Sequence, residues 1–140
     1  MQNESTIIHT DGGSRGNPGP AACSFVAEEN GLEIFKSSKY LGSTTNNVAE
    51  YRGVILALEW LISKSSSTVG GSSATFFLDS ELVVKQINGL YKVKDENLRN
   101  LFFEVLTLIK KFKGSINFKH IPREKNKIAD LLVNQELDRN

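Results

Sequence analysis

Apolar positions follow a strand period early in the chain and a helical period later. Residues 6–11, 22–29 and 33–40 are rich in branched and aromatic side chains and predict three strands. Asn30-Gly31 lies between the second and third and is a strong hairpin signal. Residues 48–63 repeat apolar side chains at helical spacing, which predicts a long helix.

The second half of the chain alternates helices with strands. Residues 64–73 have the Ser- and Gly-rich composition of a flexible loop, for which we expect no function. Strand, helix, helix, strand and helix are then predicted in turn over 74–79, 81–88, 95–112, 115–121 and 123–137. The order βββαβααβα predicts an α/β domain spanning residues 1–140: a five-stranded mixed sheet, its first three strands antiparallel, flanked by helices.

Two aspartates end predicted strands. Four glycines and two prolines within nine residues follow Asp11, so we expect the first strand to stop there. Asp79 ends the apolar run that predicts the fourth strand. A helical crossover would return the fourth strand parallel to the first. If these strands are neighbours, both carboxylates lie at the edge of the sheet where α/β proteins bind ligands.

Composition places the chain among ordinary globular proteins. Charged residues make up 24% and hydrophobic residues 39%, and no apolar run has the length of a membrane span. The single cysteine, Cys23, excludes an internal disulfide. Residues 1–6 lack an apolar signal region, and we expect a cytoplasmic protein that does not bind membranes.

Charge is unevenly distributed along the chain. Residues 85–127 contain eleven Lys or Arg against four Asp or Glu, whereas the whole chain carries a net charge of only +1. This basic segment is either a surface for a polyanion or a solvated helix face.

Four carboxylates are candidates for chemistry, each with a structural alternative. Asp11 and Asp79 would repel each other unless a divalent cation bound between them, although Asp11 could equally begin a turn. Glu50 borders the apolar face of the long helix, but Asn47-x-x-Glu50 also has the spacing of a capping box. Asp130 could belong to a polar stripe on the last helix.

The remaining polar candidates are ambiguous. Ser14, Thr44 and Thr45 are hydroxyls without a distinguishing context, and His120 is either a general base or a strand end. His9 is interpreted as a packing residue. The glycine loop lacks the endings of a nucleotide P-loop and of a dinucleotide fingerprint, and Ser14 has no GxSxG context.

Taken together, four blocks resemble type 1 ribonuclease H in content and order. Each block carries one of the four acidic residues, and the similarity extends over nearly the whole chain. The blocks are residues 9–20, 44–51, 78–84 and 120–130.

The resemblance implies an endonuclease that hydrolyses the RNA strand of RNA–DNA hybrids and leaves 5′-phosphate and 3′-hydroxyl ends. Asp11, Glu50, Asp79 and Asp130 would be catalytic residues that bind two Mg²⁺ or Mn²⁺ ions. His120 would assist proton transfer or product release. The positions that correspond to substrate contacts in the family are Gly12, Gly13, Ser14, Asn17, Thr45, Asn46, Asn47 and Glu81.

This sequence also departs from the family pattern. The family's basic protrusion is missing between the second and third helices, where Lys92 and Lys94, with Lys85, are expected to substitute in part. Ser43 and Asp95 replace residues that bind DNA phosphate in some members. We therefore expect weaker, salt-sensitive binding of the hybrid by a monomer without a separate hybrid-binding domain.

Other functions remain open at this point. A nucleic-acid-binding module on the same fold would keep hybrid affinity without cleavage. A nuclease on this fold could also act on double-stranded RNA or a branched junction, since fold alone does not determine chemistry. The Thr44–Asn47 block favours an RNA strand, and the basic segment argues against a phosphatase of small substrates.

Overall fold

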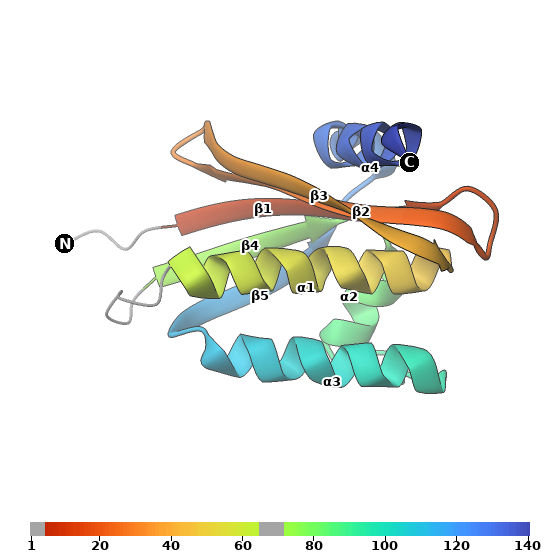
Figure 1. Cartoon of the computed structure of the whole chain (residues 1–140). Coiled ribbons are helices and arrows are strands. Elements are labelled where there is room, and N and C mark those ends of the chain that lie inside the picture. The colour runs from red at the N-terminus through yellow and green to blue at the C-terminus, as the bar shows by residue number, and fades with distance from the viewer. Residues whose placement is uncertain (1–4, 65–71) are drawn as a thin grey trace.

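A computed structural model describes residues 5–64 and 72–140 of the chain. It contains five strands, four α-helices and one 3₁₀ turn within these residues, and the element order is the predicted one (Figure 1). In chain order the elements are β1 Ser5–Ser14, β2 Gly19–Glu29, β3 Leu32–Thr44, α1 Asn46–Lys64, β4 Ser72–Leu78, α2 Glu81–Ile87, α3 Glu96–Lys111, β5 Gly114–His120, the 3₁₀ turn Arg123–Lys125 and α4 Lys127–Arg139.

The strands form one mixed sheet in the order β3-β2-β1-β4-β5. β1, β2 and β3 pair antiparallel, and β4 lies parallel to both β1 and β5. Asn30 and Gly31 take positive φ values of 53° and 77°, the backbone that a tight hairpin between twisted strands requires. The predicted mixed sheet and hairpin are confirmed, and the first and fourth strands, which were predicted to be parallel, are neighbours in the sheet.

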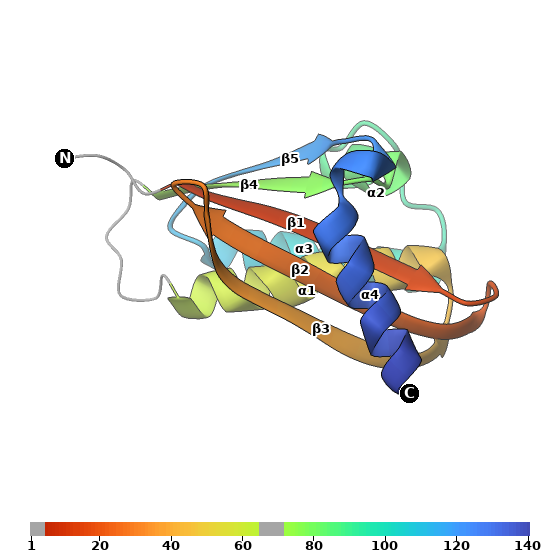
Figure 2. The same cartoon turned by 90° about the horizontal axis from the view of Figure 1, so that it is seen from above.

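Helices cover the sheet unequally. α1 packs against β1 and β2 on one face, and α3 packs on α1, below it in the view of Figure 1. α4 lies on the opposite face, where it crosses β2, β1 and β3 (Figure 2). The main core lies between the sheet and α1–α3 and includes the fully buried Ile8, Leu58 and Phe76. Among residues 5–64 and 72–140, none of the helices combines the length and apolarity that a membrane span requires.

One predicted boundary is wrong in a way that matters for the site. β1 does not stop at Asp11 but continues to Ser14, because its pairing with β2 extends to Ser14 and Ala21. The parallel pairing with β4 ends earlier, at His9 and Phe77. Asp11 therefore lies just beyond the β1–β4 ladder while still being held in place by β2.

The predicted Ser- and Gly-rich loop is only partly described. Residues 65–71 lie outside the described residues, and Ser72 and Ser73 belong to β4. The predicted last helix is divided into the 3₁₀ turn and α4, with Asn126 between them.

Candidate active site

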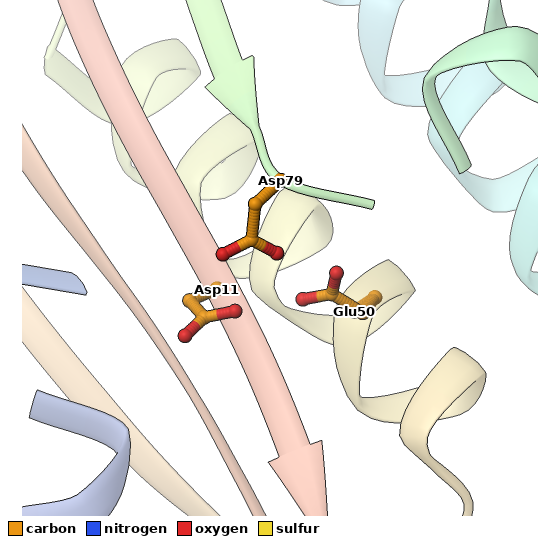
Figure 3. A group of neighbouring side chains, drawn as sticks. All are labelled: Asp11, Glu50 and Asp79. Atoms are coloured by element: carbon orange, nitrogen blue, oxygen red, sulfur yellow. The ribbon is translucent and has the colours of Figure 1, made fainter. Parts of the chain in front are cut away.

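Three carboxylates converge at the end of the β1–β4 ladder. Asp11 comes from β1, Glu50 from α1, and Asp79 follows β4 directly. One carboxylate oxygen from each lies within 4.8 Å of those of the other two, and the side chains point toward one another (Figure 3). Asp11 and Glu50 are buried, at 6% and 8% exposure. Because β1 and β4 are parallel neighbours, the two aspartates lie together, as the sequence predicted for that case.

Two glycines allow α1 to lie directly against β1. A Cβ at Gly12 would overlap the backbone carbonyl of Ala49, and a Cβ at Gly53 would lie 2.7 Å from the carbonyl oxygen of Asp11. Neither glycine has a positive φ. Gly12 therefore serves close packing of a helix on a strand, and this packing brings Glu50 into the acidic cluster.

Glu50 does not cap its own helix. Its Oε1 accepts a hydrogen bond of 2.6 Å from the backbone N–H of Gly12 on β1. The N-terminus of α1 is capped instead by Thr45, whose Oγ1 accepts from the N–H of Val48 at 3.2 Å. The capping-box alternative for Glu50 is therefore wrong.

Burial and mutual repulsion favour protonation in this cluster. Burial, followed by repulsion from Asp79, raises the pKa of Asp11 to about 7, against the opposing effect of hydrogen bonds from Glu50 and Gly12. Burial, followed by repulsion from Asp11 and Asp79, raises the pKa of Glu50 well above its ordinary value. A bound cation would stabilise the ionised carboxylates that this environment disfavours.

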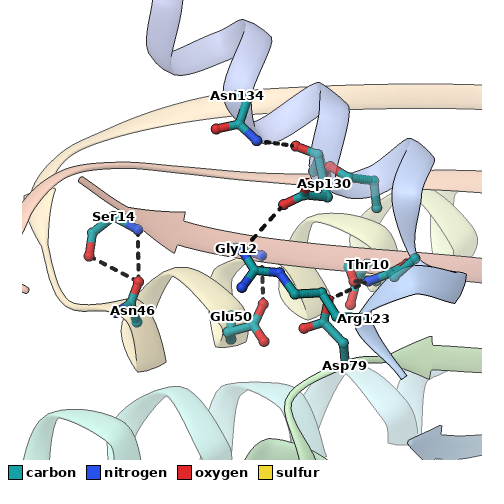
Figure 4. Close-up of polar contacts among 12 residues, drawn as sticks. Thr10, Gly12, Ser14, Asn46, Glu50, Asp79, Arg123, Asp130 and Asn134 are labelled. Atoms are coloured by element: carbon teal, nitrogen blue, oxygen red, sulfur yellow. Dashed lines mark hydrogen bonds and ion pairs between the residues drawn. The ribbon is translucent and has the colours of Figure 1, made fainter. Parts of the chain in front are cut away.

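Asp130 from α4 lies on the same cavity. This cavity has a volume of about 560 Å³ and is lined by all four acidic candidates. Asp130 is not among the oxygens within 4.8 Å of one another, but its negative charge contributes to the raised pKa of Asp11. The guanidinium of Arg123 reaches over the cavity to within 4.0 Å of Asp130 (Figure 4). The interpretation of Asp130 as part of a mere polar stripe does not account for this position.

The hairpin after β1 is joined to the start of α1 beside the cavity. Asn46 Oδ1 accepts hydrogen bonds from the backbone N–H of Ser14 at 2.9 Å and from its Oγ at 3.1 Å. Asn17 Oδ1 accepts from the N–H of Asn46 at 3.0 Å. Gly12, Gly13, Ser14, Asn46 and Asn47 all line the cavity.

Other predicted site residues lie away from the carboxylates. His120 is exposed at the end of β5 and does not line the cavity. Glu81 is exposed on α2, where it forms an ion pair of 3.1 Å with Lys85. Thr45 and Asn17 do not line the cavity, and their side chains accept hydrogen bonds from backbone N–H groups at the start of α1. His9 packs against Phe77 with ring centroids 5.2 Å apart, in agreement with its predicted packing role.

The sequence did not single out two residues of this region. Arg123 and Asn126 both lie in the last of the four motif blocks, but no periodicity distinguishes them from their neighbours. Asn126 is 1% exposed, and its Nδ2 donates hydrogen bonds to the backbone oxygen of Thr10 at 2.8 Å and to Asp79 Oδ2 at 3.3 Å. An asparagine one turn before an acidic residue was the signal that could have found it.

Several known proteins are similar to this chain over most of its length. A family model described as reverse transcriptase-like matches residues 9–136. The ribonuclease HI of Halobacterium salinarum is 36% identical over 129 residues, which cover 91% of this chain and 62% of that protein. A bifunctional protein of Mycobacterium tuberculosis is 39% identical over 134 residues, covering 94% of this chain. The chain spans only 35% of the length of this mycobacterial relative.

Solved structures show the same similarity at the level of the backbone. LC11-RNase H1, isolated from compost and solved in complex with an RNA/DNA hybrid, superposes with a TM-score of 0.91. It is 44% identical, and the match covers 96% of this chain and 97% of that chain. The similarity to LC11-RNase H1 therefore includes both the fold and the segments that carry the acidic cluster, because it extends over almost the whole chain.

Proposed function

Since this chain belongs to the type 1 ribonuclease H family, we propose that it is an endonuclease that hydrolyses the RNA strand of RNA–DNA hybrids. Cleavage leaves a 5′-phosphate and a 3′-hydroxyl. The observation that carries the proposal is the convergence of Asp11, Glu50 and Asp79, with Asp130 on the wall of the same cavity.

The chemistry of these side chains fits hard divalent cations. Mg²⁺ and Mn²⁺ prefer oxygen ligands, and three carboxylate oxygens lie within 4.8 Å of one another. Asp11, Glu50, Asp79 and Asp130 would bind two such ions. Bound divalent cations supply a water of lowered pKa and charge stabilisation for the leaving oxygen of an in-line displacement.

The chain's own residues hold the carboxylates in place for this task. β2 fixes Asp11 beyond the β1–β4 ladder, and the Gly12 N–H fixes one oxygen of Glu50 at 2.6 Å. Burial of both side chains limits access of water to the ligand oxygens. Asp11 and Glu50 then need little rearrangement when substrate binds, and such preorganisation favours catalysis.

Recognition of the RNA strand would use the polar wall of the cavity. Gly12, Gly13, Ser14, Asn46 and Asn47 present amide and hydroxyl groups there, and 2′-hydroxyls are the donors and acceptors that distinguish RNA from DNA. Asn17, Thr45 and Glu81 are proposed as further contacts at the edge of the bound duplex. His120 is proposed to assist proton transfer or product release from the end of β5.

Hybrid binding beyond the cavity would depend on the basic connection between α2 and α3. Lys92 and Lys94 are exposed there, and Lys85 lies on the adjacent end of α2. Phosphate contacts of this kind position a duplex without reading its sequence. They would partly replace the basic protrusion that the sequence lacks.

The decisive experiment compares two glutamine substitutions on α1. Glu50→Gln should abolish cleavage of a labelled RNA–DNA hybrid in Mg²⁺ or Mn²⁺, whereas Glu59→Gln, at an exposed position on the same helix, should cleave like wild type. EDTA should abolish wild-type cleavage, and only the RNA strand should be cut. Double-stranded RNA in a parallel reaction tests substrate class. Binding of the hybrid without cleavage in either metal would contradict the proposal and favour an inert binding module.

A further inference from the structure

Asn126 connects three segments that carry the acidic residues. Its side chain donates hydrogen bonds to the Thr10 carbonyl, next to Asp11, and to the carboxylate of Asp79. Its backbone oxygen accepts from the N–H of Asp130 at 3.1 Å, in the first turn of α4. A single residue thus relates the positions of three carboxylates that come from β1, from the end of β4 and from α4.

The amide orientation of Asn126 follows from its partners. The Thr10 carbonyl and the Asp79 carboxylate are both acceptors, so only the NH₂ group can face them. The Oδ1 of Asn126 is buried without a hydrogen-bond partner among the described residues. Burial of an oxygen without a hydrogen-bond partner is unfavourable. The advantage of an amide over an apolar side chain at this position therefore lies in its two N–H donors.

Asp79 benefits most from this arrangement. Its neighbours Asp11 and Glu50 are carboxyl groups that repel its negative charge. The Asn126 N–H donates to Oδ2 of Asp79 at 3.3 Å, which holds that oxygen in place and leaves Oδ1 for another ligand. The bond to Thr10 meanwhile ties the same amide to the strand that carries Asp11.

We propose that Asn126 is a positioning residue that sets the Asp79 carboxylate relative to Asp11 and α4, and thereby determines the affinity of the site for divalent cations. Asn126 does not line the acidic cavity, so it acts through Asp79 rather than on substrate. The proposal rests on the proposed function. Partners that orient metal ligands typically change metal affinity or activity about 10–100-fold when they are removed.

The test measures the metal dependence of three variants. Asn126→Ala removes both donors, Asn126→Asp keeps the size but replaces the amide, and Asn126→Ser keeps one donor if the alanine variant does not fold. Asn88→Ala is the matched control, because the Asn88 Nδ2 also donates to a backbone carbonyl, that of Phe118 at 3.1 Å, away from the carboxylates. Circular dichroism establishes that each variant is folded.

Folded Asn126 variants should need about 10–100-fold more Mg²⁺ for half-maximal cleavage, with the KM for hybrid unchanged at saturating metal. Calorimetric titration with Mn²⁺ should show the same weakening without substrate. Asn88→Ala should change thermal stability but not metal dependence. The proposal is overturned if Asn126→Asp and the other folded variants bind Mn²⁺ and respond to Mg²⁺ like wild type. If wild type itself neither binds Mn²⁺ nor cleaves hybrid, the proposed function fails instead.

Discussion

The acidic cluster should destabilise the metal-free protein, and Asp11→Asn should relieve this. In the unfolded chain Asp11 ionises near its ordinary value of 3.8, whereas burial and the charge of Asp79 raise its pKa in the folded protein to about 7. The folded state therefore retains a proton that the unfolded state loses between these two values. Stability associated with this group is fully present below pH 4 and is lost as the pH rises through 7.

The magnitude follows from the shift. A difference of about 3 pH units at roughly 1.4 kcal/mol per unit gives a cost of about 4 kcal/mol above pH 7. Asp11 is only 6% exposed, so little of this is screened by solvent. Because Asp11 shares a hydrogen bond with Glu50 and titrates with it, 4 kcal/mol is an upper bound for a single substitution.

Thermal unfolding in EDTA at pH 4, 6 and 8 measures this cost. Asp11→Asn should match wild type at pH 4 and exceed it at pH 8 by several degrees in Tm, at roughly 3 °C per kcal/mol for a chain of this size. Mg²⁺ should raise the Tm of wild type at pH 8 more than at pH 5, and should raise that of the variant little. The Glu59→Gln control should show no such dependence. A variant less stable than wild type at pH 8 in EDTA would refute the electrostatic argument.

Three further predictions test other parts of the structure. Gly12→Ala should lower stability by about 1–3 kcal/mol and reduce cleavage, because its Cβ would overlap the backbone of α1; an unchanged Tm and rate would contradict this packing. Lys92→Ala with Lys94→Ala should weaken hybrid binding without changing kcat, and the slope of log affinity against log salt should become shallower by about 1 for each phosphate that is no longer neutralised; an unchanged slope would place these lysines away from the duplex. Asp138→Asn should change stability by only about 0–1 kcal/mol, since its 2.7 Å ion pair with Arg15 is exposed; a larger change in chemical denaturation would give this pair a greater role.

The directions of the strands could be predicted from the sequence because the connections between strands largely determine them. The apolar run before Asp79 and the helical crossover that precedes it place β4 parallel to β1, and the structure shows this pairing. The end of β1 could not be predicted in the same way. Gly12 and Gly13 suggest a loop by composition, but β2 supplies pairing partners out to Ser14, and tertiary pairing overrides composition.

Residue spacing alone could not decide the role of Glu50, which only the family resemblance indicated, and it did not single out Asn126. The spacing of Glu50 fits a capping box as well as a site, and only the close approach of α1 to β1 decides between them. That approach depends on Gly12 and Gly53, which are 41 positions apart in the sequence. The partners of Asn126, Thr10 and Asp79, are likewise distant in sequence and adjacent only in the folded chain.

The close packing of α1 on β1 that stabilises the fold also brings Asp11 and Glu50 together, so that their negative charges repel each other. α1 can bury Glu50 beside Asp11 only because glycines remove the side chains that would hold the helix away. Burial then makes ionisation of both carboxyls unfavourable, and the core must offset that cost in the metal-free protein. A cation that binds between the carboxylates removes their mutual repulsion, and this relief contributes to the affinity for the cation. Substitutions that relax the cluster should therefore stabilise the protein and weaken its metal binding together, a trade-off common at functional sites.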